Sequence, residues 1–171
     1  KVQGNTMNAK KAAIAVAVTD VVYRSCLHLD NGDWGAFLDL CDDKMLYSIK
    51  AYSVEIRRDM EYLSHNKKEL ISLTEMLPKL NSDHSPLRRH ASVYTVDIDE
   101  EGKMASAVTS LAVYQNMFDG IDSHIDSGET RLFLVGKYLD KFKISGEKVC
   151  LTEREVRLDT RRLDKGTHHL I

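Results

Sequence analysis

Four side chains in this sequence are of the types that transfer protons in enzyme pockets: Asp39, Asp43, His90 and Asp140. A buried Asp–His or Tyr–Asp pair could act as a general acid and base. The spacing of the four residues forces no two of them together. Each also has a structural explanation, because Asp39 and Asp43 flank a predicted helix end, while His90 and Asp140 can pair with charged neighbours. We favour this explanation and predict no catalytic residue in this chain.

The three cysteines, Cys26, Cys41 and Cys150, lie far apart and form no Cys-x-x-Cys motif. No histidine stands at metal-ligand spacing from any of them. An odd number of separated cysteines in helical or strand segments is typical of reduced, buried thiols. Because such thiols persist in a reducing compartment, we expect a cytoplasmic protein.

Length and composition favour one globular domain over residues 1–171, with a leader at 1–7 that need not be ordered and a tail at 160–171. Hydrophobic residues make up 43% of the chain and charged residues 29%, and the net charge is −2. This balance predicts no binding to nucleic acid. An apolar run follows two lysines near the start, as in a signal peptide, but Asp20 interrupts it without a cleavage site. We therefore expect a helix there, and no segment of membrane-spanning length.

Two helices are predicted at the start of the chain. Over residues 8–29, apolar side chains recur at helical spacing, and Asn31-Gly32 ends the pattern. Asp33 is a suitable N-cap for a short second helix. Apolar residues at positions i, i+3, i+4 and i+7 extend that helix as far as Asp42-Asp43.

The middle of the chain predicts two strand pieces and a third helix. Residues 44–51 and 54–62 alternate between apolar and polar side chains, as strands do. Asn66 and Glu69 have the spacing of a capping box, which marks a helix start. Pro78 is expected to end that helix.

Long strands dominate the second half of the chain. Residues 88–99 and 103–118 alternate, and 128–159 form a long hairpin around the turn at 144–147. The buried parity changes within the second hairpin strand, which predicts a β-bulge near 153–155. Helices followed by a meander of strands indicate an α+β fold. A long curved, mostly antiparallel sheet over N-terminal helices has the outline of the nuclear-transport-factor-2-like (NTF2-like) cone.

Several segments occur in the order found in one known family. They are DWGAFLDLCDDKMLYSI (33–49), LRRHASVYTV (87–96), SLAVYQ (110–115) and LVGKYLDKF with LTEREVRLDTRRL (134–163). The matching positions include Arg89-His90, Ser110 with Val113-Tyr114, Gly136-Lys137 with Asp140, and Arg154 with Val156, Leu158 and Asp159. Together they resemble the small, or beta, subunit of bacterial Rieske-type ring-hydroxylating dioxygenases over most of residues 20–165.

The resemblance implies a structural role beside a large, or alpha, subunit that holds a [2Fe-2S] Rieske cluster and a mononuclear iron. Such complexes typically contain three large and three small chains. The sequence agrees, since it lacks the paired Cys and His motifs of a Rieske cluster and a convincing triad of two His and one carboxylate. His168 and His169 are adjacent, so their rings would point oppositely on a strand. We expect no cofactor in this chain.

Basic residues are the candidates for contact with the large subunit and with other copies of this chain. They are Arg88, Arg89, His90, Arg161, Arg162 and His168. We expect these contacts on the sheet and the tail rather than on the first helix. The tail ends in Leu170-Ile171, which could fill a partner's pocket. The alternative is that the tail folds back over the edge of its own sheet.

Two departures from the family pattern indicate a divergent branch. Val149 stands where Trp is common, and Val93-Tyr94 where Ser-Asn is usual. One such branch acts on small sulfonates, so the substrate of the complex is either an aromatic compound or a small sulfonate. Two other functions stay open. The fold also houses isomerases and dehydratases with an acid–base pocket, and it could serve as a dimeric ligand-binding module with an empty apolar pocket.

Overall fold

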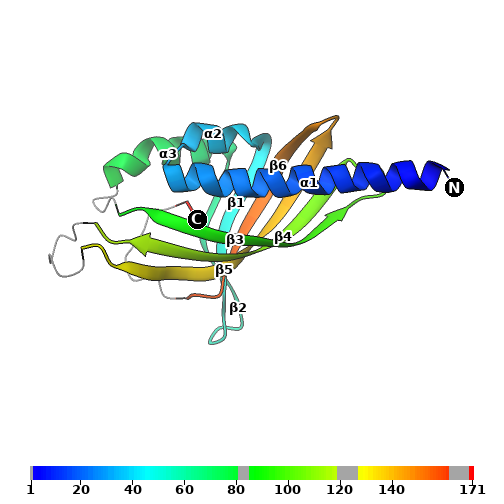
Figure 1. The fold of residues 1–171 in the computed structure, drawn as a ribbon. Coiled ribbons are helices and arrows are strands. Elements are labelled where there is room, and N and C mark those ends of the chain that lie inside the picture. Colours follow the sequence, from blue (N-terminus) through cyan, green and yellow to red (C-terminus); the bar gives the residue numbers. More distant parts are fainter. Residues whose placement is uncertain (1, 81–84, 119–126, 162–169) are drawn as a thin grey trace.

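A single six-stranded sheet curves beneath a long N-terminal helix in the computed structural model, which describes residues 2–80, 85–118, 127–161 and 170–171 (Figure 1). The strand order is β2-β1-β6-β5-β4-β3, and neighbours are antiparallel except for the parallel pair β1–β6. The elements are α1 Val2–Asn31, α2 Trp34–Asp39, β1 Cys41–Ser53, β2 Arg58–Asn66, α3 Lys67–Leu80, β3 Leu87–Ile98, β4 Met104–Asn116, β5 Thr130–Ser145 and β6 Lys148–Leu158. This arrangement confirms the predicted α+β class.

Helix α1 is longer than the predicted 8–29 and lies along the concave face of the sheet, mainly against β3 (Figure 1). Its inward side chains recur at the predicted spacing: Ile14, Val18, Val21, Val22, Ser25 and Leu29 are all buried. The expectation that no segment reaches membrane-spanning length is wrong. By length and composition alone, the helix Met7–Asn31 is long and apolar enough to cross a membrane. The burial of its apolar stripe within the domain accounts for this composition.

The cap predictions at the helix starts are confirmed. The Asp33 side chain accepts a hydrogen bond from the Ala36 main chain at 3.1 Å. In the capping box, the Asn66 main-chain N–H donates to the Glu69 carboxylate at 2.8 Å, and the Glu69 N–H donates to the Asn66 side chain at 3.1 Å. These bonds satisfy main-chain donors that the first helical turn leaves unpaired.

Three predicted boundaries are wrong. Helix α2 ends at Asp39 rather than Asp42-Asp43, because Cys41 already starts β1 and pairs with β6. Helix α3 continues past Pro78 to Leu80, since a proline in the last turn costs few main-chain hydrogen bonds. Residues 54–57 form a turn instead of a strand, in which the Ser53 hydroxyl donates to Glu55 and accepts from the Ile56 N–H.

Two of the register shifts in the sheet change which side chains face the concave interior. Between Val93 and Thr95 the β3–β4 register shifts, so the single alternation predicted for residues 88–99 holds only up to Tyr94. In the β5–β6 pair the shift leaves Thr152 as the extra residue, immediately before the predicted 153–155. The predicted bulge is therefore present, and it turns Arg154 toward the core together with the apolar residues that follow it.

Candidate functional site

The interior of the cone contains a fully buried ion pair between two neighbouring strands. Arg154 on β6 donates from Nε and Nη2 to the two carboxylate oxygens of Asp140 on β5, each at 2.8 Å. Its remaining Nη1 donates to the Ser25 hydroxyl of α1 at 2.9 Å, and that hydroxyl donates to the Val22 carbonyl at 2.6 Å. The two charged side chains are both 0% exposed. A two-point geometry of this kind fixes both groups firmly.

The environment of Arg154 keeps it charged. Burial alone would lower the pKa of the guanidinium, but the charge and hydrogen bonds of Asp140 more than offset this, so the pKa is raised. The guanidinium carbon also lies 3.9 Å from the centre of the Tyr138 ring, which adds a cation–π contact. Burial raises the pKa of Tyr138 as well. The centre of the cone is thus an ion pair stacked on an aromatic ring, in which both carboxylate oxygens of Asp140 are already bound.

A second buried cluster receives the last two described residues of the chain. Arg89 on β3 binds the Asp30 carboxylate at 2.7 Å and donates from Nη2 to the Leu170 carbonyl oxygen at 2.5 Å. The Tyr47 hydroxyl of β1 donates to the Ile171 main-chain oxygen at 2.7 Å. Leu170 and Ile171 are only 1% and 2% exposed. The expectation that these residues fill a partner's pocket is therefore wrong, because they complete the core of their own domain.

The four candidate acid–base residues lie apart. Asp39 is exposed on α2, and Asp43 lies 3.3 Å from Lys67 with its side chain fully exposed. His90 lies on the outer face of β3, where its ring meets that of Tyr114 edge-on at 5.2 Å rather than a carboxylate of the described residues. Asp140 is in the core, paired with its strand neighbour as the structural explanation predicted. The structure brings no two of the four together.

The predicted subunit-contact residues fall into three groups. Arg88 and His90 are exposed on the outer face of β3, and Arg161 is exposed at the end of β6, where it binds Glu55 at 2.6 Å. That hydrogen bond is the largest cause of a Glu55 pKa of about 2, below its ordinary value. Arg89 points inward and is bound within its own chain, and the exposed Arg88 also donates from Nη1 to the Asp30 carbonyl oxygen at 2.8 Å. Arg162 and His168 lie outside the described residues.

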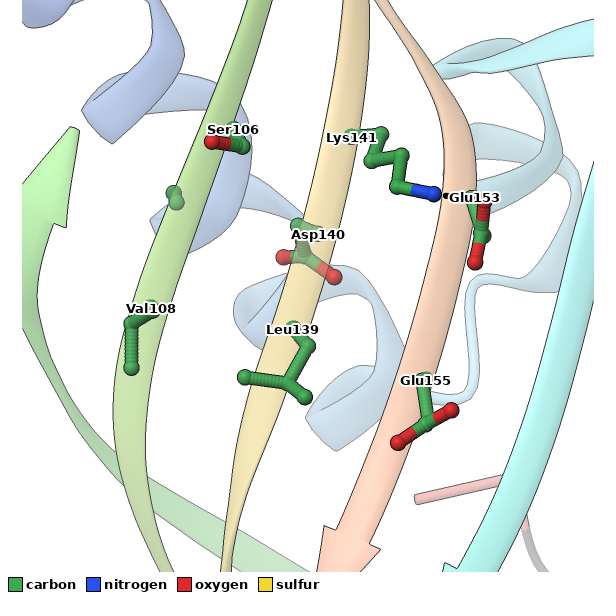
Figure 2. A pocket seen from close by; sticks show the side chains of 8 residues that line it. Ser106, Val108, Leu139, Asp140, Lys141, Glu153 and Glu155 are labelled. Atoms are coloured by element: carbon green, nitrogen blue, oxygen red, sulfur yellow. Dashed lines mark hydrogen bonds and ion pairs between the residues drawn. The ribbon is translucent and has the colours of Figure 1, made fainter. Parts of the chain in front are cut away.

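Two shallow hollows lie on the outer face of the sheet. The first, of about 290 Å³, is formed by β4, β5 and β6, and Figure 2 shows Lys141 reaching across it to Glu153, at 2.8 Å, with Glu155 farther along β6. The second, of about 480 Å³, is lined by Arg88, His90, Tyr114 and their neighbours on β4 and β5. Both are open and lined partly by charged side chains, as is typical of contact surfaces rather than small-molecule pockets.

Metal-binding geometry is not found among the described residues: no three His, Cys, Asp or Glu side chains are grouped to hold an ion. The three cysteines are free thiols there, Cys26 and Cys41 buried and Cys150 half-buried. Burial raises the pKa of Cys41 to about 12 and also raises that of Cys26. Such thiols are poor nucleophiles and poor ligands near neutral pH.

Sequence reasoning missed most of the buried polar groups. The sequence places Ser25 in the helical stripe and Tyr47 at the edge of the core, but it predicts neither their hydrogen bonds nor any role for Asp30. A signal for one pair does exist, because Asp140 and Arg154 occupy inward parities among apolar residues of their strands. Two opposite charges on inward parities of a hairpin are rarely buried unless they are paired.

The chain is similar in sequence to two beta subunits of oxygenases, although no family model matches it. It is 51% identical, over 154 residues, to the methanesulfonate monooxygenase hydroxylase subunit beta of Methylosulfonomonas methylovora, covering 90% of this chain and 85% of that protein. It is 26% identical, over 155 residues, to the 2-aminobenzenesulfonate 2,3-dioxygenase subunit beta of an Alcaligenes species, covering 90% and 96%.

Solved structures agree with this result. One from Novosphingobium aromaticivorans, described as the beta subunit of an aromatic-ring-hydroxylating dioxygenase, has a TM-score of 0.71 and 28% identity, covering 86% of this chain and 90% of that chain. An NTF2-like protein with a cystatin-like fold from Novosphingobium aromaticivorans has a TM-score of 0.64 at 13% identity, covering 95% and 92%, which concerns the fold alone. The predicted NTF2-like fold is confirmed.

Proposed function

The chain belongs to the family of small, or beta, subunits of ring-hydroxylating dioxygenases and related monooxygenase hydroxylases, and from this we propose that it is the structural, non-catalytic subunit of a hydroxylase complex. The observation that carries the proposal is the 51% identity to a methanesulfonate monooxygenase hydroxylase subunit beta. Both sequence relatives carry the name of a sulfonate. The substrate class that this supports best is a small sulfonate, oxidised by the complex.

A large subunit supplies the redox chemistry in this proposal. It would hold the [2Fe-2S] cluster and the mononuclear iron, since this chain lacks the paired Cys and His motifs that a Rieske cluster requires. The expected assembly is three large and three small chains. The free thiols of the described residues suit a reducing compartment, which supports the cytoplasm as its location.

The contact surface is proposed on the outer face of β3, β4 and β5 and near the end of β6. Arg88, His90 and Tyr114 line the larger hollow there, and Leu132, paired with Tyr114 across the strands, is 54% exposed. Exposed arginine and aromatic groups beside an apolar side chain are typical of protein interfaces. Arg161 lies at the other end of the proposed surface, while Arg162 and His168 stay sequence-based candidates.

An acid–base function finds less support. The cone of an isomerase or dehydratase needs a titratable group that is free to exchange protons with a ligand. Here Asp140 gives both carboxylate oxygens to Arg154, and the space near Tyr47 is filled by Leu170 and Ile171.

Co-expression with the large subunit from the same host tests the proposal. We expect the two chains to co-purify with the mass of a three-plus-three assembly, and methanesulfonate turnover and iron to require the large chain. Arg88→Glu should weaken the complex, whereas the control Arg24→Glu, at an exposed position of α1, should not. Stoichiometric iron or turnover in the small chain alone would overturn the proposal. So would loss of turnover in Asp43→Asn when assembly is intact.

A further inference from the structure

The last two residues are held by their main chain as well as by their side chains. Arg89 donates to the Leu170 carbonyl oxygen at 2.5 Å, Tyr47 donates to the Ile171 main-chain oxygen at 2.7 Å, and the Ile171 N–H donates back to the Tyr47 hydroxyl at 3.0 Å. Their side chains are buried among core residues. Figure 1 places this end of the chain between α1 and the sheet. Polar recognition of the main chain and burial of two apolar side chains together resemble the binding of a short peptide.

The groups that receive Leu170 and Ile171 are also held by contacts with other parts of the domain. Asp30, near the end of α1, accepts hydrogen bonds from the Arg89 main-chain N–H at 3.1 Å and from Arg89 Nη1 at 2.7 Å. This leaves Nη2 directed at Leu170. Tyr47 belongs to β1, a strand paired on both sides with β2 and β6. Three separate elements therefore build the site, and Asp30 acts as a positioning residue for Arg89.

We propose that Tyr47, Arg89 and Asp30 form a peptide-binding site, called here the tail site, whose built-in ligand is the dipeptide Leu170-Ile171. The hydrogen bonds involve only main-chain atoms of the ligand, so the site requires an extended main chain and two apolar side chains. A free peptide with the same two residues should therefore enter the site when the chain's own residues leave.

This proposal is independent of the proposed function. It concerns a site within the small subunit alone and would hold whatever complex the chain joins. It also goes further than the packing of a core, because a core residue cannot be exchanged for a copy in solution without unfolding of the domain. Exchange in trans is the property that distinguishes a binding site from a permanent part of the core.

Thiol labelling of the full chain tests the proposal. Ile171→Cys, in a Cys150→Ser background, reports the opening of the tail site through the rate at which a thiol reagent modifies Cys at position 171. Val16→Cys, at a position 71% exposed on α1, gives the rate of an open thiol. We expect position 171 to react at least a hundredfold more slowly than position 16. A free peptide of residues 165–171 should speed its labelling severalfold, and the same peptide with both apolar residues replaced by Asp should not.

Hydrogen–deuterium exchange of the unsubstituted chain gives a second measurement, because the Ile171 amide donates to Tyr47. In Tyr47→Phe the exchange of this amide should rise at least about tenfold, because the substitution removes both hydrogen bonds between Tyr47 and Ile171. The free peptide should raise exchange in the parent chain as well. Equal labelling at positions 171 and 16 would overturn the proposal. Labelling and exchange that ignore the peptide, in a chain folded by circular dichroism, would overturn it too.

Discussion

Two arginines on the same strand form similar ion pairs on opposite faces of the sheet. Arg154 faces the interior, where it and Asp140 are 0% exposed. Arg157 faces outward and binds Asp59 at 2.6 Å and Glu155 at 2.6 Å, with its side chain 25% exposed. On the outer face, Lys50 also lies 3.3 Å from Glu155, so the charges there form a chain across β2, β1 and β6.

The comparison shows that the distance between the charged atoms does not by itself decide how much an ion pair contributes to the stability of the fold. Outside, water can replace a lost partner, and each exposed pair contributes about 0–1 kcal/mol. Inside, water is excluded, and an arginine deprived of its carboxylate would keep a buried charge with no compensation. The fold therefore depends on an intact pair between Arg154 and Asp140. The outer pairs contribute little to stability, so their side chains can change partners when the surface binds another chain.

The largest effect is expected for Asp140→Asn, which keeps the shape but removes the charge that faces Arg154. We expect unfolding in urea to show a loss of about 3–5 kcal/mol, the usual cost of leaving a buried charge unpaired. The double variant Asp140→Leu with Arg154→Met should recover much of this loss. A loss below about 1 kcal/mol in the single variant, as for an exposed pair, would remove the distinction between the two faces.

A substitution that changes no charge can displace the strand that carries both arginines. A Cβ added at Gly136 of β5 would lie 2.5 Å from the Arg157 carbonyl oxygen and 3.1 Å from the Leu158 Cα, so Gly136→Ala must push β6 away. We expect a loss of about 1–3 kcal/mol from the forced shift. Gly35→Ala is the matched control, because its added Cβ meets nothing within 4 Å. Equal stability of the two variants by thermal unfolding would contradict this expectation.

The buried interior should also lose stability at high pH. Burial raises the pKa of Tyr47 from 10.0 to about 12 and that of Cys41 from 9.0 to about 12. The unfolded chain ionises these groups first, so their contribution to stability is complete below pH 9 and is lost as the pH rises toward about 12. The urea midpoint of unfolding should fall as the pH is raised from 8 to 11. The midpoint of the variant Tyr47→Phe should fall less steeply than that of the parent chain. Identical slopes for the two proteins would exclude Tyr47 as a cause.

The smallest effect is expected on the outer face. Arg157→Ala removes the contacts with Asp59 and Glu155, and we expect a loss of about 0–1 kcal/mol in dilute buffer. The difference from the parent should shrink further in 1 M salt, because screening weakens exposed pairs. A loss above about 2 kcal/mol that salt does not change would mean that Arg157 behaves like Arg154.

Much of the fold follows from local chemistry. The stripe of α1, the capping box at Asn66 and the hairpin turn with Gly146 at φ 63° are set by residues close in sequence, and the structure has all three. The bulge at Thr152 was placed almost correctly because the burial parity on either side of it differs. The register shift near Tyr94 is not predicted, because polar and apolar residues mix there.

The polar contacts inside the cone could not be predicted from local sequence in the same way. Tyr47 and Ile171 are joined by two hydrogen bonds although they are 124 positions apart, and no local pattern encodes such a contact. Arg89 illustrates the limit, since alternation alone does not say which face of β3 is buried. Its neighbour Arg88 points outward. A prediction that places the strand correctly but assigns the wrong buried face would therefore put Arg88 in the core and Arg89 on the surface.

The parallel pairing of β1 with β6 has a consequence for how the chain folds during synthesis. Ile49 lies opposite Val156, and about a hundred residues separate these strands along the chain, so their contact is slow to form. Until β6 has been made, the edge of β1 that faces away from β2 has no strand to pair with. A nascent chain emerging from the ribosome therefore presents unpaired main-chain N–H and C=O groups along residues 46–51 for most of its synthesis. Chaperone capture of the growing chain should be strongest in this interval and should end when β6 joins the sheet.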